Sequence, residues 1–415
     1  MMGMEKLPLS KVKSVILISV LLVLFLSAVS FIHASDTISN ISVGTSPEGA
    51  VYDSAMGEIF VANMGSNTVS VISDTSYTIV ANITVGVGPV CLAYDSAKSE
   101  VYVTDVGSSI VNVISDKSNS IVTNVTVGTN PNGIAYDSNK REIFVANWGS
   151  DDVSVISDKT NSVVATISVG ANPVGVAYDS VKGEIFVTNS YWTRGGNGTV
   201  SIISDKNNQV IETISVGRNP FYPAYGSDKG EVLVPNEGNG SISVISDKNN
   251  TVISNVVLPG RIENPWALAY DSAKGTIFCT SGNNDMDGTV FVISDSSKDV
   301  IANLTQPPVP TGLQVSYSSP FDMYPMYLDK HPSDASITEG YAGAGPHGIV
   351  YDPTKGTIFI VNNNAGNVSA VPDDQILPSS PSIVPEFTPE TIILIITIIS
   401  LIFITLVRLK SKIMK

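Results

Sequence analysis

The sequence predicts an all-β protein folded as a seven-bladed β-propeller, and three observations support this prediction. First, a Tyr-Asp pair anchors a repeat that returns along most of the chain, in six intact copies and one degenerate copy. The intact pairs begin at Tyr52, Tyr94, Tyr136, Tyr178, Tyr270 and Tyr351, and the degenerate copy is Tyr225-Gly226. Second, the first three steps are 42 residues each, which is the period of a four-stranded propeller blade. Third, each copy divides into four short runs rich in β-branched and aromatic residues.

The third copy illustrates the four expected strands of a blade, which we name A to D from the axis outward. They comprise residues 133–136, 142–146, 153–156 and 163–169. Short turns rich in Asp, Asn and Ser join A to B and C to D. Such side chains hydrogen-bond to nearby backbone groups in turns, so we expect these turn residues to be structural.

The two ends of the repeat predict how the ring closes. The last copy has strands A, B and C but no convincing D strand, whereas residues 37–43 precede the first A strand and match the D strands of other copies. We therefore expect residues 37–43 to pair with the strand at Asn367–Val371. This pairing closes the ring by backbone hydrogen bonds and leaves no open edge there.

The B strands end in a recurring motif. Its copies are Val61-Ala-Asn63, Val103-Thr-Asp105, Val145-Ala-Asn147, Val187-Thr-Asn189 and Val361-Asn-Asn363. These motifs resemble the YVTN-type β-propeller repeat family, and the resemblance covers nearly all of residues 37–372. It implies an extracellular seven-bladed propeller of the kind common in archaeal surface-layer and surface-antigen proteins. It implies no reaction and no ligand.

Residues 1–34 have the layout of a secretory signal. Three lysines precede an apolar run from Val15 to Phe31, and Ile32-His33-Ala34 offers a small-residue cleavage point. The run is also at the lower limit of length for a membrane span. A cleaved signal peptide and an uncleaved signal anchor therefore both fit, and the propeller is predicted to follow over 35–373.

The C-terminal part of the sequence has three sections. A Pro- and Ser-rich linker spans 374–390, an apolar run predicts a transmembrane segment at 391–407, and a basic tail follows at 408–415. Basic residues beside a span favour the cytoplasmic side, which places the propeller outside the cell. Pro385-Glu386-Phe387, directly before the span, resembles the PEF-type sorting signal of archaea, and this resemblance implies processing by an archaeosortase-like transpeptidase.

Charge and cysteine content restrict the partners. Residues 35–407 exclude seven of the 23 basic residues and one of the 38 acidic ones, which leaves a net charge near −21. Such a field repels nucleic acid and suits a solvated or cation-binding surface. The two cysteines, Cys91 and Cys279, fall in non-adjacent copies, so we expect small core residues rather than a disulfide.

Eight Asn-X-Ser/Thr sequons predict glycosylation of a secreted protein. They begin at Asn40, Asn82, Asn124, Asn197, Asn239, Asn249, Asn303 and Asn367. Asn40, Asn82, Asn124 and Asn303 share one position in strand D, where alternation directs them away from the buried face. Because strand D forms the outer rim, these four are expected to be exposed. Plain polar edge residues fit the same pattern.

Ligand binding is expected where the copies differ, because insertions in repeat proteins gather in loops on one face. The long departures, at 189–199, 235–241, 281–289 and 307–345, lie in B–C and D–A loops, which share one face. On that face, the residue after the Pro that opens each A strand varies around the axis. These seven residues, which we call the mouth ring, are Glu48, Val90, Asn132, Val174, Phe221, Trp266 and His347.

The mouth ring combines aromatic and polar side chains, with Tyr222 beside it. Such a surface can hold a glycan or peptide by stacking and hydrogen bonds, and large residues at a propeller axis also simply fill space. Both interpretations stay open. The expected ligand contacts are Glu48, Asn132, Phe221, Tyr222, Trp266 and His347.

Signals for metal binding and catalysis are sparse. Residues 283–288 follow the ligand spacing of a calcium loop, with Asn283, Asp285 and Asp287 as candidate ligands, but the closing Glu is missing, which favours a solvated turn. No other cofactor is expected. The chain has three histidines, and one of them, His33, lies in the predicted signal. A metal site made of three histidines of the propeller is therefore excluded. A small acid–base site at His331, Glu339 and His347 stays open.

Two hypotheses from different classes follow. The favoured one is a glycosylated, envelope-attached propeller that serves as a surface-layer component or as an adhesion and interaction module, without enzymatic activity and with other surface proteins or glycans as partners. The alternative is an extracytoplasmic enzyme or solute-binding propeller, lactonase-like or sugar-binding, with its site at the mouth ring. Self-assembly favours the first, and turnover lost in His347→Ala favours the second.

Overall fold

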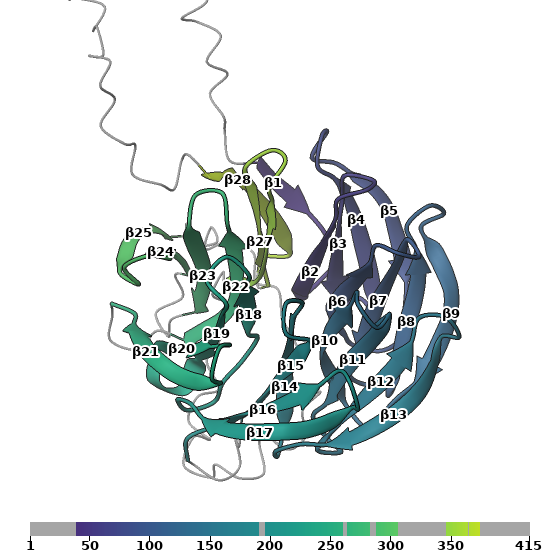
Figure 1. The fold of residues 1–415 in the computed structure, drawn as a ribbon. Coiled ribbons are helices and arrows are strands. Elements are labelled where there is room, and N and C mark those ends of the chain that lie inside the picture. Colours follow the sequence, from purple (N-terminus) through teal and green to yellow (C-terminus); the bar gives the residue numbers. More distant parts are fainter. Residues whose placement is uncertain are drawn as a thin grey trace, which may run out of the picture. The chain divides into compact units, whose positions relative to one another are not determined.

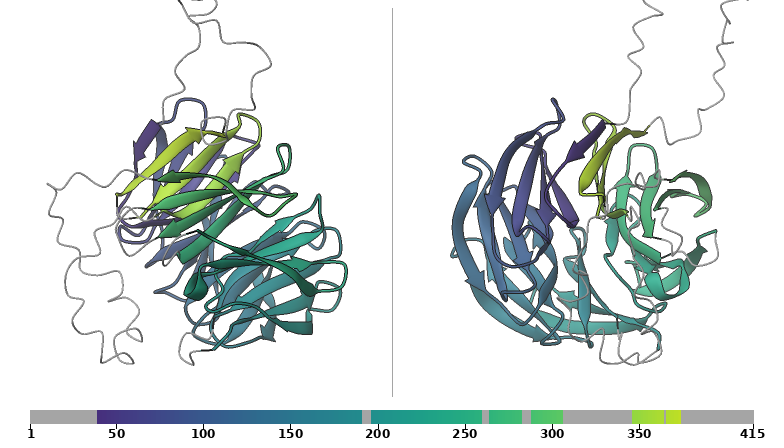
Figure 2. Two further views of the ribbon diagram at one scale, coloured as in Figure 1. Left: turned by 90° about the vertical axis from the view of Figure 1, so that its left-hand side faces the viewer. Right: turned by 180° about the vertical axis from the view of Figure 1, so that it is seen from behind.

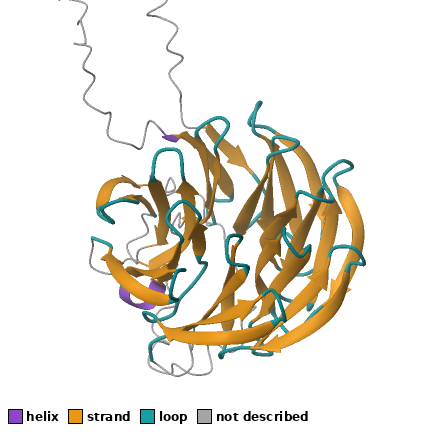
Figure 3. Cartoon of the chain, viewed as in Figure 1, coloured by secondary structure: helices purple, strands orange, loops and turns teal. Residues whose placement is uncertain are grey.

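The computed structural model describes residues 39–190, 196–259, 264–282, 288–305, 346–363 and 365–373. They form seven four-stranded antiparallel sheets arranged as the blades of a propeller (Figure 1). Strands and loops make up nearly all of the described chain (Figure 3). The all-β, seven-bladed prediction is confirmed.

Blades 1 to 4 follow one another in chain order, each running from strand A at the axis to strand D at the rim. Blade 1 comprises β2 (Pro47–Asp53), β3 (Glu58–Asn63), β4 (Thr68–Ser73) and β5 (Ile79–Thr84). Blade 2 comprises β6 (Pro89–Asp95), β7 (Glu100–Asp105), β8 (Ile110–Ser115) and β9 (Ser120–Thr126). Blade 3 comprises β10 (Pro131–Asp137), β11 (Glu142–Asn147), β12 (Asp152–Ser157) and β13 (Ser162–Ser168). Blade 4 comprises β14 (Pro173–Asp179), β15 (Glu184–Asn189), β16 (Thr199–Ser204) and β17 (Gln209–Ser215).

Blades 5 to 7 continue the ring. Blade 5 comprises β18 (Ala224–Gly226), β19 (Glu231–Asn236), β20 (Ser241–Ser246) and β21 (Thr251–Val257), with the 3-10 turn η1 (Glu237–Asn239) before β20. Blade 6 comprises β22 (Asn264–Asp271), β23 (Thr276–Gly282), β24 (Thr289–Ser294) and β25 (Val300–Thr305). Blade 7 comprises β26 (Pro346–Asp352), β27 (Thr357–Asn362), β28 (Asn367–Pro372) and, as its outermost strand, β1 (Ser39–Ser42).

The ring closes where β1 pairs with β28. The two strands are antiparallel, with Ile41 opposite Val368, and the Val43 amide extends the ladder by donating to the Gly366 carbonyl at 3.0 Å. Figures 1 and 2 show β1, from the start of the described chain, lying against the last blade. The predicted N-terminal closing strand is therefore confirmed. It supplies the strand that blade 7 lacks and so removes an exposed strand edge.

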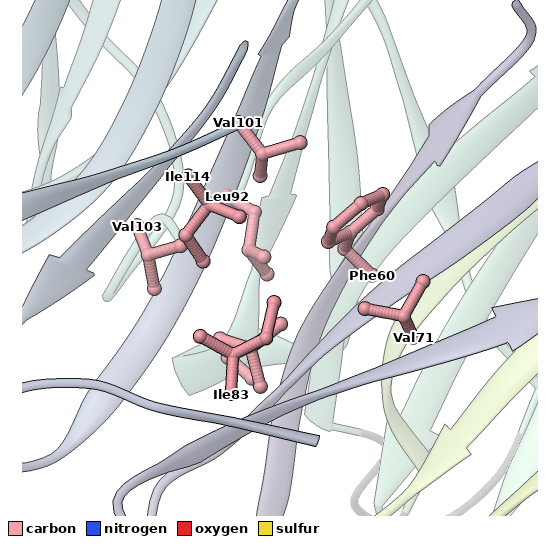
Figure 4. Packing of buried hydrophobic residues seen from close by; sticks show 9 residues of the cluster. Phe60, Val71, Ile83, Leu92, Val101, Val103 and Ile114 are labelled. Carbon is pink, nitrogen blue, oxygen red and sulfur yellow. The ribbon is translucent and has the colours of Figure 1, made fainter. Parts of the chain in front are cut away.

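The hydrophobic core lies between neighbouring blades rather than in one central mass. In the junction of blades 1 and 2, Phe60, Val71 and Ile83 of the first blade pack against Val101 and other residues of the second (Figure 4). Five further clusters repeat this arrangement around the ring. Each blade thus buries both faces against its neighbours, as nearest-neighbour stacking in repeat proteins requires.

The repeated polar residues are structural. Asp137 Oδ1 accepts hydrogen bonds from the backbone amides of Asn139 and Lys140, at 2.8 and 2.9 Å, and fixes the A–B turn. The Asn that ends strand B is buried and binds strand C, as when Asn63 Nδ2 donates to Ser70 Oγ at 2.9 Å. The motif that suggested the family is thus used to hold two strands together.

The termini and cysteines complete the comparison with the sequence. The predicted signal (1–34), linker (374–390), transmembrane segment (391–407) and tail (408–415) lie outside the described residues. Among the residues that the structure describes, no helix is long and apolar enough to cross a membrane. Cys91 and Cys279 form no disulfide, as expected. Cys279 is buried in the core, and Cys91 is partly buried and packs against two core clusters. The prediction of small core residues is therefore confirmed for Cys279 and holds in part for Cys91.

Candidate functional site

The mouth ring lies at the start of each innermost strand, and the close approach of these strands brings its side chains together. Each A strand contacts the A strands of its two neighbours around the axis. A Cβ added at Gly133 would meet the Val174 carbonyl oxygen at 2.3 Å, and one at Gly348 would meet the Glu48 carbonyl at 2.4 Å. In blades 1, 3, 4 and 7, glycine after the ring residue therefore allows this close spacing.

One side of the ring is a polar and aromatic chain across blades 1, 7 and 6. Glu48 Oε2 lies 2.7 Å from His347 Nδ1, and Glu48 Oε1 accepts from Asn363 Nδ2 at 2.7 Å. The His347 ring stacks on Trp266, with centroids 4.5 Å apart and planes 11° from parallel. The Glu48 and His347 side chains keep 16% and 22% of their surface exposed, so solutes can reach this pair.

On the other side of the ring, aromatic side chains pack together and a hydrogen bond joins blades 5 and 3. Phe221 packs edge-on against Trp266, with centroids 4.6 Å apart, and against Tyr222. Tyr222 OH donates to Asn132 Oδ1 at 2.8 Å, from blade 5 to blade 3, passing over blade 4. Phe221 and Asn132 are both buried at 7% exposure. This half fills the axis.

Three ring residues are fixed through their backbone by a threonine of the preceding blade. The hydroxyls of Thr104, Thr188 and Thr280 donate to the carbonyls of Asn132, Phe221 and His347 at 2.7 to 2.9 Å. Thr104 and Thr188 are the middle residues of the strand-B motif in blades 2 and 4, and Thr280 holds the corresponding position in blade 6. The sequence showed the threonines but gave no sign that each one positions a mouth residue.

A mouth-face carboxyl that the sequence did not single out is Glu237 in η1. Burial raises the pKa of Glu237 to about 7, while the Asn219 amide, which donates to Oε2 at 3.2 Å, opposes the shift. η1 contacts β22, the strand that carries Trp266. Its only sequence signal was an acid directly after the Pro235-Asn236 end of strand B.

The structure thus brings together all six expected ligand contacts at the mouth. Chemically, the exposed part offers an aromatic stack, a carboxylate and an imidazole, which suits hydrogen bonding and stacking. Within the described ranges, no group of three His, Cys, Asp or Glu residues could hold a metal ion. The calcium-loop residues Asn283, Asp285 and Asp287 lie outside those ranges, as do His331 and Glu339.

The sequon asparagines lie mostly on the surface. Asn40, Asn82, Asn124 and Asn303 are exposed on outer strands, as predicted, and Asn197, Asn239 and Asn249 are exposed in loops and turns. Asn82 Oδ1 accepts from Ser70 Oγ at 2.8 Å and Asn40 Oδ1 from Ser369 Oγ at 2.7 Å. These bonds engage the amide oxygens of two residues that are themselves exposed. Asn367 is only partly exposed.

The fold and its closing strand define this chain as a seven-bladed β-propeller. No model of a known protein family matches it, and no curated protein matches its sequence. Among solved structures, it is similar to Kuenenia stuttgartiensis hydrazine synthase, with a TM-score of 0.62 and 18% sequence identity over 80% of this chain and 97% of that one. At this identity, the similarity shows the shared fold.

Proposed function

We propose that this protein is a glycosylated β-propeller of the outer cell surface that serves as a surface-layer component or as an adhesion and interaction module, without enzymatic activity. The observation that carries the proposal is the set of sequon asparagines exposed on the outer strands. A glycan attaches to the amide nitrogen, and at Asn82 and Asn40 the amide oxygen is already held by a serine. These rim side chains are therefore held in place for glycosylation, the modification that sequons of a secreted protein receive.

The sequence features at both ends support the same proposal. A secretory signal or signal anchor at 1–34, a span at 391–407 and a PEF-type sorting segment would place the propeller outside an archaeal cell and allow archaeosortase-like processing. The net charge near −21 of residues 35–407 keeps such a protein soluble and disfavours nucleic acid as a partner.

The first test is the glycopeptide and intact mass of the protein from its native membrane fraction. We expect a missing signal, a C-terminus processed near Pro385, and glycans on Asn40, Asn82 and Asn124. Asn255 is the matched internal control: its Oδ1 accepts from Ser243 Oγ at 2.8 Å in the same strand position, but it starts no sequon. Unmodified rim asparagines in that material would reject the glycoprotein proposal.

A second candidate function is ligand binding at the mouth ring, favoured by the partly exposed Glu48–His347 pair stacked on Trp266. A sugar is the fitting ligand class, because sugar rings stack on aromatic faces and their hydroxyls bond carboxylate and imidazole. In its enzymatic form, lactonase-like or sugar-cleaving, this pair would be the acid–base group, and turnover would be lost in His347→Ala.

Removing the aromatic platform should abolish binding at the mouth. Trp266→Ala and Phe221→Ala are expected to weaken the binding of oligosaccharides released from the native envelope by at least about fivefold in calorimetry, because each aromatic contact contributes about 1 kcal/mol beyond its buried area. Val122→Ala, an exposed rim change, should bind as the unaltered protein does. Equal affinity in all three variants would show that the mouth is a plug.

A further inference from the structure

The face opposite the mouth, where the A–B and C–D turns of neighbouring blades meet, is held by lysines. In five of the seven junctions, a lysine ammonium contacts an acidic residue or its carbonyl across the junction or beside it. These lysines are Lys98, Lys182, Lys274, Lys298 and Lys355, for junctions 2–3, 4–5, 6–7, 5–6 and 7–1. These five junctions therefore share one arrangement, in which a lysine ammonium lies beside a largely buried acidic residue.

Two of these junctions show the complete set of oxygen donors. Lys98 Nζ lies 2.8 Å from Glu100 Oε2, 2.7 Å from the Asp158 carbonyl oxygen and 3.4 Å from Asn161 Oδ1. Lys182 has the corresponding three partners, Glu184, the Asp247 carbonyl and Asn250. In both, the Glu begins strand B of the lysine's own blade, and the other two donors lie in the C–D turn of the next blade.

The junction of blades 1 and 2 has the same three donors without the lysine. Glu58 begins strand B of blade 1, and Asp116 and Asn119 occupy the C–D turn of blade 2. The position that corresponds to Lys98 is Met56, a side chain with 51% of its surface exposed. Both turns keep the backbone of the lysine junctions. Gly57 and Ser99 have φ of 66° and 60°, and Asn119 and Asn161 have φ of 48° and 49°.

Some oxygen atoms at this junction are buried without a hydrogen bond, although Tyr94 OH donates to Asp116 Oδ2 at 3.1 Å and a side-chain hydrogen bond with Asn119 opposes the effect of burial on the pKa of Glu58. Glu58 Oε2 and Asn119 Oδ1 are inaccessible and have no hydrogen bond among the described residues. The same holds for Asp116 Oδ1 and Asp53 Oδ2, whose residues are 2% and 0% exposed. Burial first, and then the neighbouring Asp53, raise the pKa of the Asp116 carboxyl; burial also raises the pKa of Glu58. Lys117, an exposed side chain, lowers the Asp116 pKa only slightly.

We propose that the junction of blades 1 and 2 binds a small inorganic cation from solution, at the position that a lysine ammonium occupies in the sister junctions. The donors are the Glu58 carboxylate, the Asp116 carbonyl and the Asn119 side-chain oxygen. A bound cation neutralises the Glu58 carboxylate, which has no ion pair among the described residues, and lowers the cost of burying the neighbouring Asp116. The contacts of Lys98, at 2.7 to 3.4 Å, are longer than calcium–oxygen bonds of about 2.3–2.6 Å. Ammonium and potassium are therefore expected to bind more tightly than calcium.

The experiment measures thermal unfolding of the full-length chain at constant ionic strength. Tetramethylammonium chloride, whose cation is too large for the junction, is replaced stepwise by ammonium, potassium or calcium chloride. In the unaltered protein, the melting temperature should rise with ammonium and potassium concentration, as mass action predicts for a ligand of the native state. Met56→Lys, which supplies the ammonium from within the chain, should raise the melting temperature in tetramethylammonium and remove the response.

Two further variants make the outcome specific. Met56→Leu keeps the junction without a cation and should retain the full response, whereas Lys98→Met opens a second such junction and should enlarge it. The same melting temperature in all four salts would overturn the proposal, as would a response that persists undiminished in Met56→Lys. A melting temperature that rises with calcium alone would show that the site does not have the geometry of an ammonium site, and would overturn the proposal. Because Lys98→Met adds a site rather than removing one, it tests the proposal even where Met56→Lys does not fold.

Discussion

Deleting residues 36–43 is expected to abolish cooperative folding of the whole propeller, although the deletion removes one short strand. β1 supplies the outer strand of blade 7, and Ile41 is 7% exposed in a core cluster that includes Ile59 of blade 1 and Phe359 of blade 7. The strand therefore joins the first and last blades. Without it, β28 presents an unpaired edge and the core between blades 7 and 1 opens to water.

The deletion is measured by chemical unfolding of the full-length chain, followed by circular dichroism. Ile41→Ala is a smaller change in the same strand. It should lower the free energy of unfolding by about 2–5 kcal/mol, as large-to-small changes in cores do. Ser42→Ala, an exposed neighbour in the same strand, should change stability by no more than about 0.5 kcal/mol. An unchanged unfolding midpoint in the deletion variant would contradict closure by β1.

The second large effect is expected at Asp105, a buried carboxyl in blade 2. In blades 1, 3, 4, 5 and 7, the last residue of strand B is an Asn that donates to a strand-C serine. Blade 2 has Asp105 there and Asn112 in place of the serine, with the Asn112 amide donating to Asp105 Oδ2. Burial raises the pKa of Asp105 to about 8, opposed only by the Gly86 amide.

The sign of the pH dependence follows from this raised pKa. The unfolded chain loses this proton near pH 3.9, whereas the folded protein keeps it until about pH 8. Between these values the unfolded state binds fewer protons, so stability falls as pH rises, and above about pH 8 the loss is constant. Below pH 4 the carboxyl is neutral in both states and the loss is absent.

Restoring the Asn–Ser pair should therefore stabilise the protein by an amount that grows with pH. We expect Asp105→Asn combined with Asn112→Ser to gain on the order of a few kcal/mol at pH 8 and little at pH 4. The measurement is the urea midpoint from pH 4 to 8.5, taken as the difference between variant and unaltered protein so that other carboxyls cancel. Asn112→Ser alone keeps the carboxyl and its pH dependence. A pH-independent difference for the double variant would show that Asp105 titrates normally.

Several features of the fold could be predicted because they are encoded locally and repeated. The 42-residue spacing from Tyr52 to Tyr94 to Tyr136 sets the length of one blade, and alternation within a strand sets which side chains face the neighbouring blade. The missing D strand of the last copy and the extra one before the first indicated the closure. The rim position of Asn82 and Asn124 followed from the strand order in the same way.

The candidate sites depend on contacts between blades, and these the repeat does not encode. Predicting a ring of residues at the axis required only chain direction, but Glu48 meets His347 across 299 positions of sequence and Tyr222 meets Asn132 across 90. Which side chains meet there depends on how far each reaches and on the spacing of the inner strands.

The sequence by itself determined the architecture of this protein: all-β, seven blades, four strands each, and closure by the first strand. A short-range pattern repeated many times is enough for this, because each blade is built from local hairpins and stacks only on its neighbours. The tertiary structure alone decided that the mouth ring is partly interlocked and that the junction of blades 1 and 2 lacks its lysine. Met56 is an ordinary exposed residue in the sequence, and only the donors around Lys98 and Lys182 show what its position would otherwise hold.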